Sequence, residues 1–204
     1  MTQFGLFDAP LVLVGGERRC ITYYDRFVPA DDAEAAFAAL RGGIDWQANR
    51  RVMYEREVDV PRLTAHFPLA ELASGEAEGI DAKSAAAIAG LARRVSEALA
   101  APFNSIGLNF YRDGNDSVAP HNDRLDDLVK GEPIALVSLG STRRMTIRSK
   151  TPGEPAVPID LEAGSLLAMS WSSQLHYTHG VAKTKAHVGE RISIALRVRL
   201  PKSD

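Results

Sequence analysis

The chain has 204 residues, 45% of them hydrophobic, which favours a single domain with a sizeable apolar core. Its formal net charge of −2, from 24 basic and 26 acidic residues, argues against a protein held to nucleic acid by bulk positive charge. A single cysteine, Cys20, excludes an internal disulfide framework, and we expect a cytoplasmic protein without a membrane partner because no membrane-length apolar stretch or secretory signal pattern occurs.

The first hundred residues predict an arm, a strand and two helices. Residues 1–19 are expected to form an N-terminal arm that covers another surface, and CITYYDRFV after them is typical of a strand. An alanine-rich helix should follow from Pro29 to the Gly42–Gly43 pair. A second helix should start at Asp81 or Ser84 and end at Leu99, after a flexible acidic insertion, ELASGEAEGI. Both helices should pack on one side of a sheet.

Residues 45–70 alternate charged and apolar side chains, which predicts a strand pair with an exposed tip. This hairpin contains Arg50, Arg51, Arg56 and Arg62 together with Met53 and Tyr54. Such a mixture is expected where a protein touches both a phosphate backbone and a base. A solvated edge hairpin is the alternative, because three acidic residues lie among the arginines.

After Pro102 the sequence becomes mostly β. Short apolar runs are separated by turns: SIGLNFYR, PIALVSLG, RMTIRS, AVPIDLE, GSLLAMSW and ERISIALRVRL. Their spacing favours a double-sheet roll or barrel over a parallel α/β sheet. We therefore expect an α+β, mostly β fold, with residues 20–204 in one domain and its β-rich core at about 104–200.

The segment from Asn104 to Asp127 carries a His-x-Asp pair, His121 and Asp123, after a strand-like run and a turn-rich loop. Residues two apart on an extended backbone point to the same side, so the two side chains can converge on one point. A solvated loop is the alternative for this pair taken alone. The downstream HYTHGV segment supplies His179. Two histidines and one carboxylate that leave positions open suit Fe(II) and oxygen chemistry.

The last strand-like run places Arg191 and Arg197 six residues apart, and therefore on one face, with Ser193 between them. Two inward-facing arginines inside a small β roll are costly unless an anion neutralises them. A dicarboxylate co-substrate would do so, and Asn109 and Tyr111 share a face that could add hydrogen bonds. The alternative is an exposed C-terminal strand whose arginines face water.

These segments resemble the AlkB-type Fe(II)/2-oxoglutarate-dependent dioxygenases from about Ile21 to Arg199. The resemblance rests on VPRLTAHF, FNSIGLNFYRDGNDSVAPHND, IALVSLGSTRRM, HYTHGV and ERISIALRVR. It implies a double-stranded β-helix (jelly-roll) core with N-terminal helices on one sheet and a nucleotide-recognition hairpin at about 45–70. His121, Asp123 and His179 would hold Fe(II). Arg191 would pair with the far carboxylate of 2-oxoglutarate, and Arg197, Asn109, Tyr111 and Ser193 would complete its pocket.

The resemblance further implies an oxidative demethylase that uses O2 and 2-oxoglutarate. It would hydroxylate the methyl group of bases such as 1-methyladenine or 3-methylcytosine and release formaldehyde, succinate and CO2. The partner would be alkylated nucleic acid, with DNA favoured and RNA left open, bound by a monomer, with the base flipped out of the duplex. Substrate contacts would come from Met53, Tyr54, Arg56, Arg62 and Phe67. A small-molecule or protein substrate for the same iron chemistry is the alternative.

Several positions depart from the family pattern. Arg124 and Leu125 stand where family members that repair bases usually carry acidic residues that help to read the base. Ser193 replaces a common asparagine, and Thr178 replaces an aromatic residue before the distal histidine. His176 could compete with His179 as ligand, but His-Gly-Val resembles the family's ligand position, so we expect His176 to line the pocket or to pack. For His66 and His187 we expect a surface or packing role.

Overall fold

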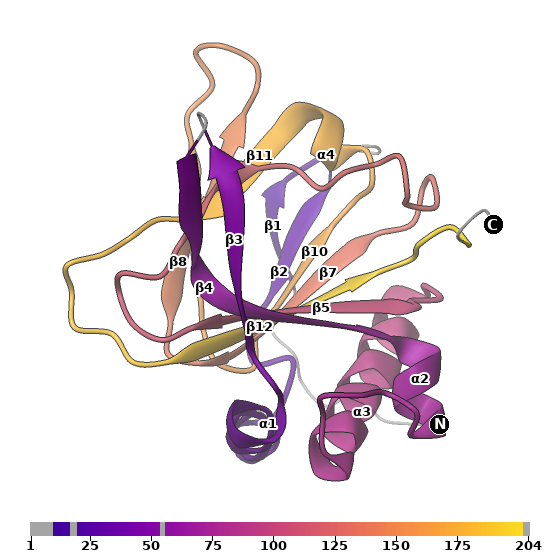
Figure 1. Cartoon of the computed structure of the whole chain (residues 1–204). Coiled ribbons are helices and arrows are strands. Elements are labelled where there is room, and N and C mark those ends of the chain that lie inside the picture. Colours follow the sequence, from indigo (N-terminus) through magenta and orange to yellow (C-terminus); the bar gives the residue numbers. More distant parts are fainter. Residues whose placement is uncertain (1–9, 17–19, 54–55, 202–204) are drawn as a thin grey trace.

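Two antiparallel sheets form the body of the molecule in the computed structural model, which describes residues 10–16, 20–53 and 56–201 (Figure 1). The larger sheet has eight strands in the order β1-β2-β10-β7-β12-β5-β4-β3 and the smaller has four in the order β6-β11-β8-β9. The large-sheet strands, in that order, are Leu11–Val14, Ile21–Tyr24, Leu166–Met169, Ile134–Gly140, Arg191–Arg197, Ser105–Tyr111, Arg56–Pro68 and Gln47–Met53. Those of the small sheet are Val118–His121, Tyr177–Val181, Arg143–Ser149 and Val157–Leu161. The predicted mostly β, double-sheet roll is confirmed.

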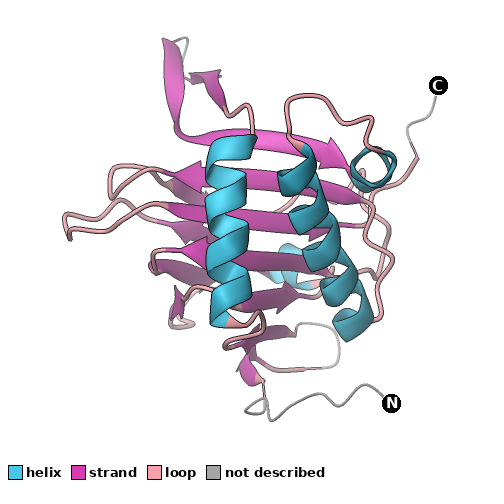
Figure 2. Ribbon diagram, turned by 90° about the horizontal axis from the view of Figure 1, so that it is seen from below, coloured by secondary structure: helices cyan, strands magenta, loops and turns pink. Residues whose placement is uncertain are grey.

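Helices α1 (Ala30–Gly43) and α3 (Ala82–Leu99) lie side by side across one face of the large sheet (Figure 2). The Asp81 side chain caps α3 by accepting a hydrogen bond of 2.7 Å from the backbone N–H of Ser84. Helix residues such as Leu40, Ile88 and Val95 are fully buried against this face. The sequence prediction of two alanine-rich helices on one side of the sheet is therefore confirmed.

A second apolar cluster fills the space between the two sheets. Leu136 and Ala195 of the large sheet belong to it together with Met145, Ile147 and Val181 of the small sheet. Strand β12 therefore has helices on one face and the sandwich interior on the other, and six of its seven residues are buried. Side chains that alternate along β12 and β5 thus point either into the helix-covered core or into the roll.

The acidic insertion ELASGEAEGI is not entirely irregular, which corrects the sequence prediction. Its first part contributes most of a short helix, α2 (Leu69–Ser74), which ends at Gly75 with a left-handed φ of 78°. Leu72 is 5% exposed and packs into the helix-side core, with Leu69 against the same cluster. The two leucines lie three residues apart, so they share one face of a helix. Burial of this apolar face favours a helix here despite the glycines and acidic residues of the segment.

The hairpin predicted at residues 45–70 is β3 and β4, and its distal end projects beyond the sheet (Figure 1). Strand β4 has 13 residues and pairs with β3 near the tip and with β5 at its base. The hairpin is thereby continuous with strands β5 and β12 of the large sheet. Residues 54 and 55 lie outside the described structure, as do the side chains of 51–59.

Part of the expected N-terminal arm is a strand. Leu11–Val14 form β1, the edge of the large sheet, and pair with β2, whereas residues 1–9 and 17–19 lie outside the described part of the chain. A short helix, α4 (Ser173–His176), precedes β11. Among the described helices, none combines the length and apolarity needed to cross a bilayer.

Candidate functional site

His121, Asp123 and His179 converge at the open end of the roll. His121 ends β6 and lies directly opposite His179 of β11 in the antiparallel register, with ring centroids 4.5 Å apart. Asp123 follows two residues after β6, and one potential ligand atom from each of the three residues lies within 4.8 Å of the others. A divalent metal ion fits this donor set, which leaves further coordination positions open.

Hydrogen bonds outside the three donors hold two of them in place. The Nδ1 atom of His121 lies 2.9 Å from the carbonyl oxygen of Ala119, so this nitrogen donates and leaves the lone pair of Nε2 for a metal ion. The backbone N–H of Asp123 donates to Oε1 of Gln174, at 2.9 Å. Gln174 lies on α4 and is 2% exposed. Sequence reasoning missed Gln174, because nothing in the sequence indicates that α4 folds beside the loop after β6.

Arg197 donates hydrogen bonds from two nitrogen atoms to the carboxylate of Asp123. Its Nε and Nη2 atoms lie 2.9 and 3.0 Å from Oδ2 and Oδ1 of Asp123. Burial acts to raise the pKa of Asp123, but the positive charge and hydrogen bonds of Arg197 outweigh it and hold this pKa below its usual value. The carboxylate is therefore ionised at neutral pH, as a metal ligand must be.

His179 is also in the form that a metal requires. The ring is 5% exposed, and burial, assisted by the nearby His121, lowers its pKa from 6.5 to about 4. The imidazole is consequently neutral at physiological pH, with a lone pair available for coordination. His176, at the end of α4, is half-buried and does not belong to this cluster or to the described lining of the adjacent cavity.

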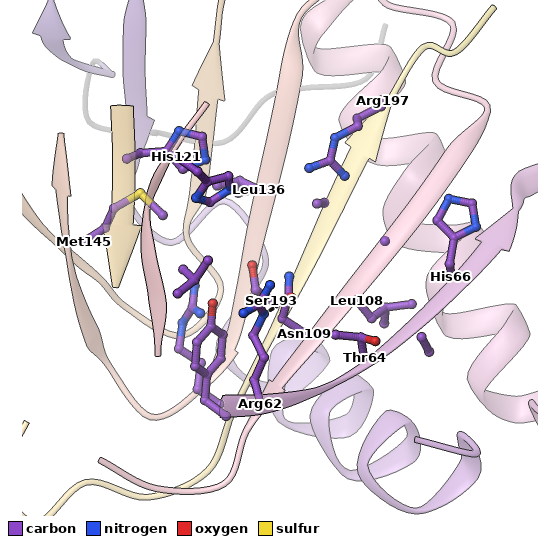
Figure 3. Close-up of a pocket in the computed structure, with 17 residues that line it drawn as sticks. Arg62, Thr64, His66, Leu108, Asn109, His121, Leu136, Met145, Ser193 and Arg197 are labelled. Carbon is purple, nitrogen blue, oxygen red and sulfur yellow. Dashed lines mark hydrogen bonds between the residues drawn. The ribbon is translucent and has the colours of Figure 1, made fainter. Parts of the chain in front are cut away.

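A cavity of about 270 Å³ opens beside the metal ligands, between β4, β5 and β12 of the large sheet and β6, β8 and β11 of the small one (Figure 3). Arg191 lies within its lining and is 1% exposed. One nitrogen, Nη2, donates to Oγ of Ser138 at 2.8 Å, whereas Nε and Nη1 have no hydrogen-bond partner among the described residues. Burial lowers the pKa of this guanidinium, which nevertheless remains a cation.

A buried guanidinium with unpartnered N–H donors needs an anion to accept from them, and a carboxylate is such a partner. The Tyr111 ring lies beneath the same group, 5.1 Å from Cζ of Arg191. Ser193 pairs with Asn109 on one side and with Ser138 on the other. A diacid that reaches the metal with one end and Arg191 with the other therefore fits the residues present. Ser138 was missed from the sequence; its polar side chain within the apolar run IALVSLG is the signal that could have found it.

The remaining wall of the cavity comes from β4. Arg62, Thr64 and His66 alternate along this strand and line the cavity. Arg62 Nε donates to Oδ1 of Asn109 at 2.6 Å (Figure 3). Its Nη1 donates to the carbonyl of Ser117 at 3.3 Å. His66 is exposed, as expected, but it stands at the cavity, with Nε2 3.0 Å from Oγ of Ser105. His187 is exposed and away from the described lining.

Phe67 requires a correction, because it does not line this cavity. It is five residues from Arg62 and so points to the opposite face of β4, where it is 6% exposed within the helix-side core. The three other predicted substrate contacts cannot be placed: the side chains of Met53 and Arg56, and the whole of Tyr54, lie outside the described structure.

Comparisons with known proteins agree with this geometry. The model of the 2OG-Fe(II) oxygenase superfamily matches residues 20–197. The alpha-ketoglutarate-dependent dioxygenase alkB homolog 3 of Rattus norvegicus is 29% identical over 206 residues, covering 97% of this chain and 69% of the relative. The DNA oxidative demethylase ALKBH2 of Bos taurus is 33% identical over 115 residues, covering 53% and 41% of the two chains.

A solved structure shows the same fold. The structure of OsALKBH1 superposes with a TM-score of 0.55 and 15% sequence identity, covering 91% of this chain and 99% of that one. The family match spans every strand except β1, and it includes the three potential metal ligands and the buried Arg191. The chain belongs to the 2OG-Fe(II) oxygenase superfamily and is an AlkB-type Fe(II)/2-oxoglutarate-dependent dioxygenase.

Proposed function

We propose that this enzyme removes alkyl groups from the ring nitrogens of nucleobases in nucleic acid, with DNA as the preferred polymer. The observation that carries the proposal is the composition of the cavity. One continuous lining contains His121 and His179, the buried Arg191 and three residues of β4. That strand is part of the projecting hairpin, so the same element reaches outward to a polymer and inward to the reacting centre. The similarity to ALKBH2 of Bos taurus, a DNA oxidative demethylase, supports this choice of substrate.

His121, Asp123 and His179 would hold Fe(II), and Arg191 would hold the far carboxylate of 2-oxoglutarate. When bound, iron would activate O2, which is the oxidant, and oxidation of 2-oxoglutarate and of a substrate carbon–hydrogen bond would each supply two of the four electrons that O2 takes up. One oxygen atom of O2 ends in succinate, formed with CO2, and the other in the substrate. A hydroxymethyl group on a ring nitrogen then loses formaldehyde and leaves an N–H, so atoms and electrons balance.

The protein's own contribution is placement. Arg197 keeps Asp123 ionised and fixes the direction of its two oxygens, and Ala119 fixes the ring of His121. Arg191, buried below the metal centre, sets how far a diacid can enter. Strand β4 forms the remaining wall of the cavity, on the side where a substrate would enter. A base within a duplex cannot reach such a cavity and has to be flipped out.

Mass spectrometry of short oligonucleotides, each with one N-methylated base, tests the proposal. A panel with 1-methyladenine, 3-methylcytosine, 1-methylguanine or 3-methylthymine covers the common methylated ring positions. We expect loss of the methyl mass from at least one substrate, dependent on Fe(II) and 2-oxoglutarate, and no loss with Asp123→Ala. Methyl retention in every oligonucleotide at stoichiometric enzyme would refute nucleobase dealkylation.

A small-molecule or protein substrate is the second candidate. The exposed Arg124 and the half-buried Leu125, which follow the metal ligand Asp123, favour it because neither residue offers an acceptor to the edge of a base. Succinate formation that needs Fe(II) and 2-oxoglutarate, combined with methyl retention in the whole oligonucleotide panel, would support this candidate.

A further inference from the structure

Arg143, the first residue of β8, is a buried arginine outside the described lining of the cavity. Its residue is 3% exposed, and the alternation along β8 places its side chain on the interior face of the small sheet. The guanidinium donates to three backbone carbonyls: Nη1 to Asp113 at 2.8 Å, and Nη2 to Asp116 at 2.9 Å and to Ala182 at 2.8 Å. Because guanidinium is a rigid planar fork, it can hold carbonyls of separate segments at fixed separations.

The three carbonyls belong to two segments, each next to a strand that carries a histidine of the metal site. Two of them lie in the β5–β6 loop (residues 112–117), which leads into β6 and to His121 at its end. The third belongs to Ala182, directly after β11, the strand that contains His179. Arg143 therefore bridges the start of β6 and the end of β11.

Strand β6 needs such a bridge because its own pairing is short. It has four residues, lies at the edge of the small sheet and pairs with β11 alone. The register shifts between the pairs His179↔His121 and Val181↔Val118, and Pro120 has no backbone N–H to donate. Few ladder hydrogen bonds therefore hold β6, so its position depends more on the contacts at its two ends.

The two bridged segments are also packed against each other at a glycine. The backbone N–H of Thr184 donates to the carbonyl of Gly114 at 2.9 Å. A Cβ atom at Gly114 would lie 2.4 Å from the carbonyl oxygen of Thr184, which is too close for any side chain. Within the β5–β6 loop, the buried carboxylate of Asp116 accepts from the backbone N–H and the guanidinium of Arg112. The carbonyls that Arg143 binds thus belong to a closely packed joint.

Arg143 also contacts the residue that begins this loop at the diacid end of the cavity. Tyr111 is the last residue of β5, lines the cavity and is buried. Its ring centroid lies 5.6 Å from Cζ of Arg143 and 5.1 Å from Cζ of Arg191. The β5–β6 loop therefore connects the ring beside Arg191 to the strand that carries His121. A displacement of this loop would disturb both ends of the cavity.

We propose that Arg143 is a positioning residue for the metal and 2-oxoglutarate sites, which holds the β5–β6 loop against the end of β11 through its planar fork of hydrogen bonds. The inference rests on the proposed roles of His121 and Arg191 in holding the metal and the diacid, and it does not depend on which substrate is oxidised. Arg143 acts through three backbone carbonyls and through the ring of Tyr111.

Binding measurements on the full-length protein test the proposal without turnover. Arg143→Met removes all three hydrogen bonds, whereas Arg143→Lys keeps the charge and loses the fork. In both variants we expect affinity for Co(II), measured by visible absorption, to fall about tenfold. Affinity of the Mn(II)-loaded protein for 2-oxoglutarate, measured by calorimetry, should also fall about tenfold.

The other outcomes of these titrations contradict the proposal in different ways. If either affinity is unchanged in Arg143→Met, one loop does not position both sites. If both affinities are unchanged in Arg143→Lys, a positive charge is sufficient and the fork is not the bridge. A wild-type protein that binds neither Co(II) nor 2-oxoglutarate would overturn the proposed ligand sites together with the role of Arg143.

Two controls separate positioning from a general loss of stability. Arg144→Met removes the neighbouring guanidinium, which is exposed and pairs with Asp160 at 2.7 Å, and it should bind as the wild type does. Leu91→Ala opens a cavity in the helix-side core, so it should lower the melting temperature and leave both affinities unchanged. Equal losses of affinity in Leu91→Ala and Arg143→Met would reduce Arg143 to a general structural role and overturn the proposal.

Gly114→Ala tests the same joint without altering Arg143. The added methyl group would lie 2.4 Å from the carbonyl oxygen of Thr184, so the two segments must separate. We expect the same loss of both affinities as in Arg143→Met. The matched control is Gly90→Ala on α3, where an added methyl group meets no atom within 4 Å and binding should not change. Wild-type affinities in Gly114→Ala would show that neither site depends on the position of the loop, which would overturn the proposal.

Discussion

Arg197 and Asp123 form a two-pronged ion pair in which the side chains are 17% and 9% exposed. The sequence assigned Arg197 to a co-substrate carboxylate, but in the structure its anion is the carboxylate of a potential metal ligand. Solvent has little access to replace the bonds of such a pair, so loss of one partner leaves the other buried and uncompensated.

Substitution Arg197→Gln should therefore destabilise the metal-free protein by about 3 kcal/mol, because Asp123 remains buried without its cation. The matched control is Arg199→Gln, which breaks the more exposed pair with Asp127 and should change stability by less than about 1 kcal/mol. Urea unfolding of both variants in the presence of a chelator measures the difference. Similar losses of unfolding free energy in the two variants would show that the buried pair contributes no more to stability than the exposed one.

Unlike Arg197, Arg191 should contribute to binding of the diacid and not to the stability of the metal-free protein. Substitution Arg191→Met removes a buried guanidinium with two unpartnered nitrogens, so the metal-free protein should be no less stable than the wild type. Calorimetry with Mn(II)-loaded protein should nevertheless show 2-oxoglutarate affinity at least about 100-fold weaker, because a charge-assisted, two-pronged contact is lost. Affinity within threefold of wild type would place the diacid elsewhere.

The buried, neutral His179 predicts a specific pH dependence of stability. Its pKa is lowered from 6.5 to about 4 in the folded protein. Between about pH 6.5 and pH 4, therefore, this histidine binds a proton in the unfolded chain but remains neutral in the folded chain. Stability of the metal-free protein should fall as the pH drops from about 6.5 to 4, by up to about 3 kcal/mol from this group. The lowered pKa of Asp123 acts in a separate, more acidic window.

The variant His179→Gln isolates that contribution. Urea unfolding at several pH values between 7 and 4.5, with a chelator present, should give a flatter stability profile for the variant than for the wild type. Parallel profiles would mean that folding leaves the pKa of His179 unshifted, so that burial does not set its charge.

Gln174 should support metal binding without touching the metal. In Gln174→Leu the backbone N–H of Asp123 loses its acceptor, so the loop after β6 is held less firmly and metal affinity should fall about tenfold. Titration with Co(II), followed by visible absorption, measures this affinity without turnover. Gln174→Asn tests shortening of the side chain and should be intermediate, whereas Leu175→Ala on the exposed side of α4 should bind as the wild type does.

Features of the fold and the site could be predicted from the sequence where they depend on local contacts along one strand or helix. The alternation along β12 and β5 places Arg191, Ser193, Asn109 and Tyr111 around one cavity, because strand periodicity is a local property. The same rule assigns Phe67 to the face opposite Arg62, so that error came from the family resemblance and not from the strand pattern.

Contacts between distant segments could not be predicted in this way. The register that sets His179 opposite His121, and the position of α4 against the loop that carries Asp123, depend on how the two sheets stack. The partner of Arg197 belongs to the same class, since 74 residues separate it from Asp123. His66 had no visible partner in the sequence because the cavity that it lines is built from strands of both sheets.

The most direct test of the central claim is anaerobic absorption spectroscopy of the purified chain with Fe(II) and 2-oxoglutarate. If His121, Asp123 and His179 hold iron while Arg191 holds the far end of the diacid, a visible charge-transfer band should appear on addition of both. It should saturate at one iron per chain, disappear in His179→Ala and require far more 2-oxoglutarate in Arg191→Met. No band in the wild type, or an undiminished band in His179→Ala, would contradict the account.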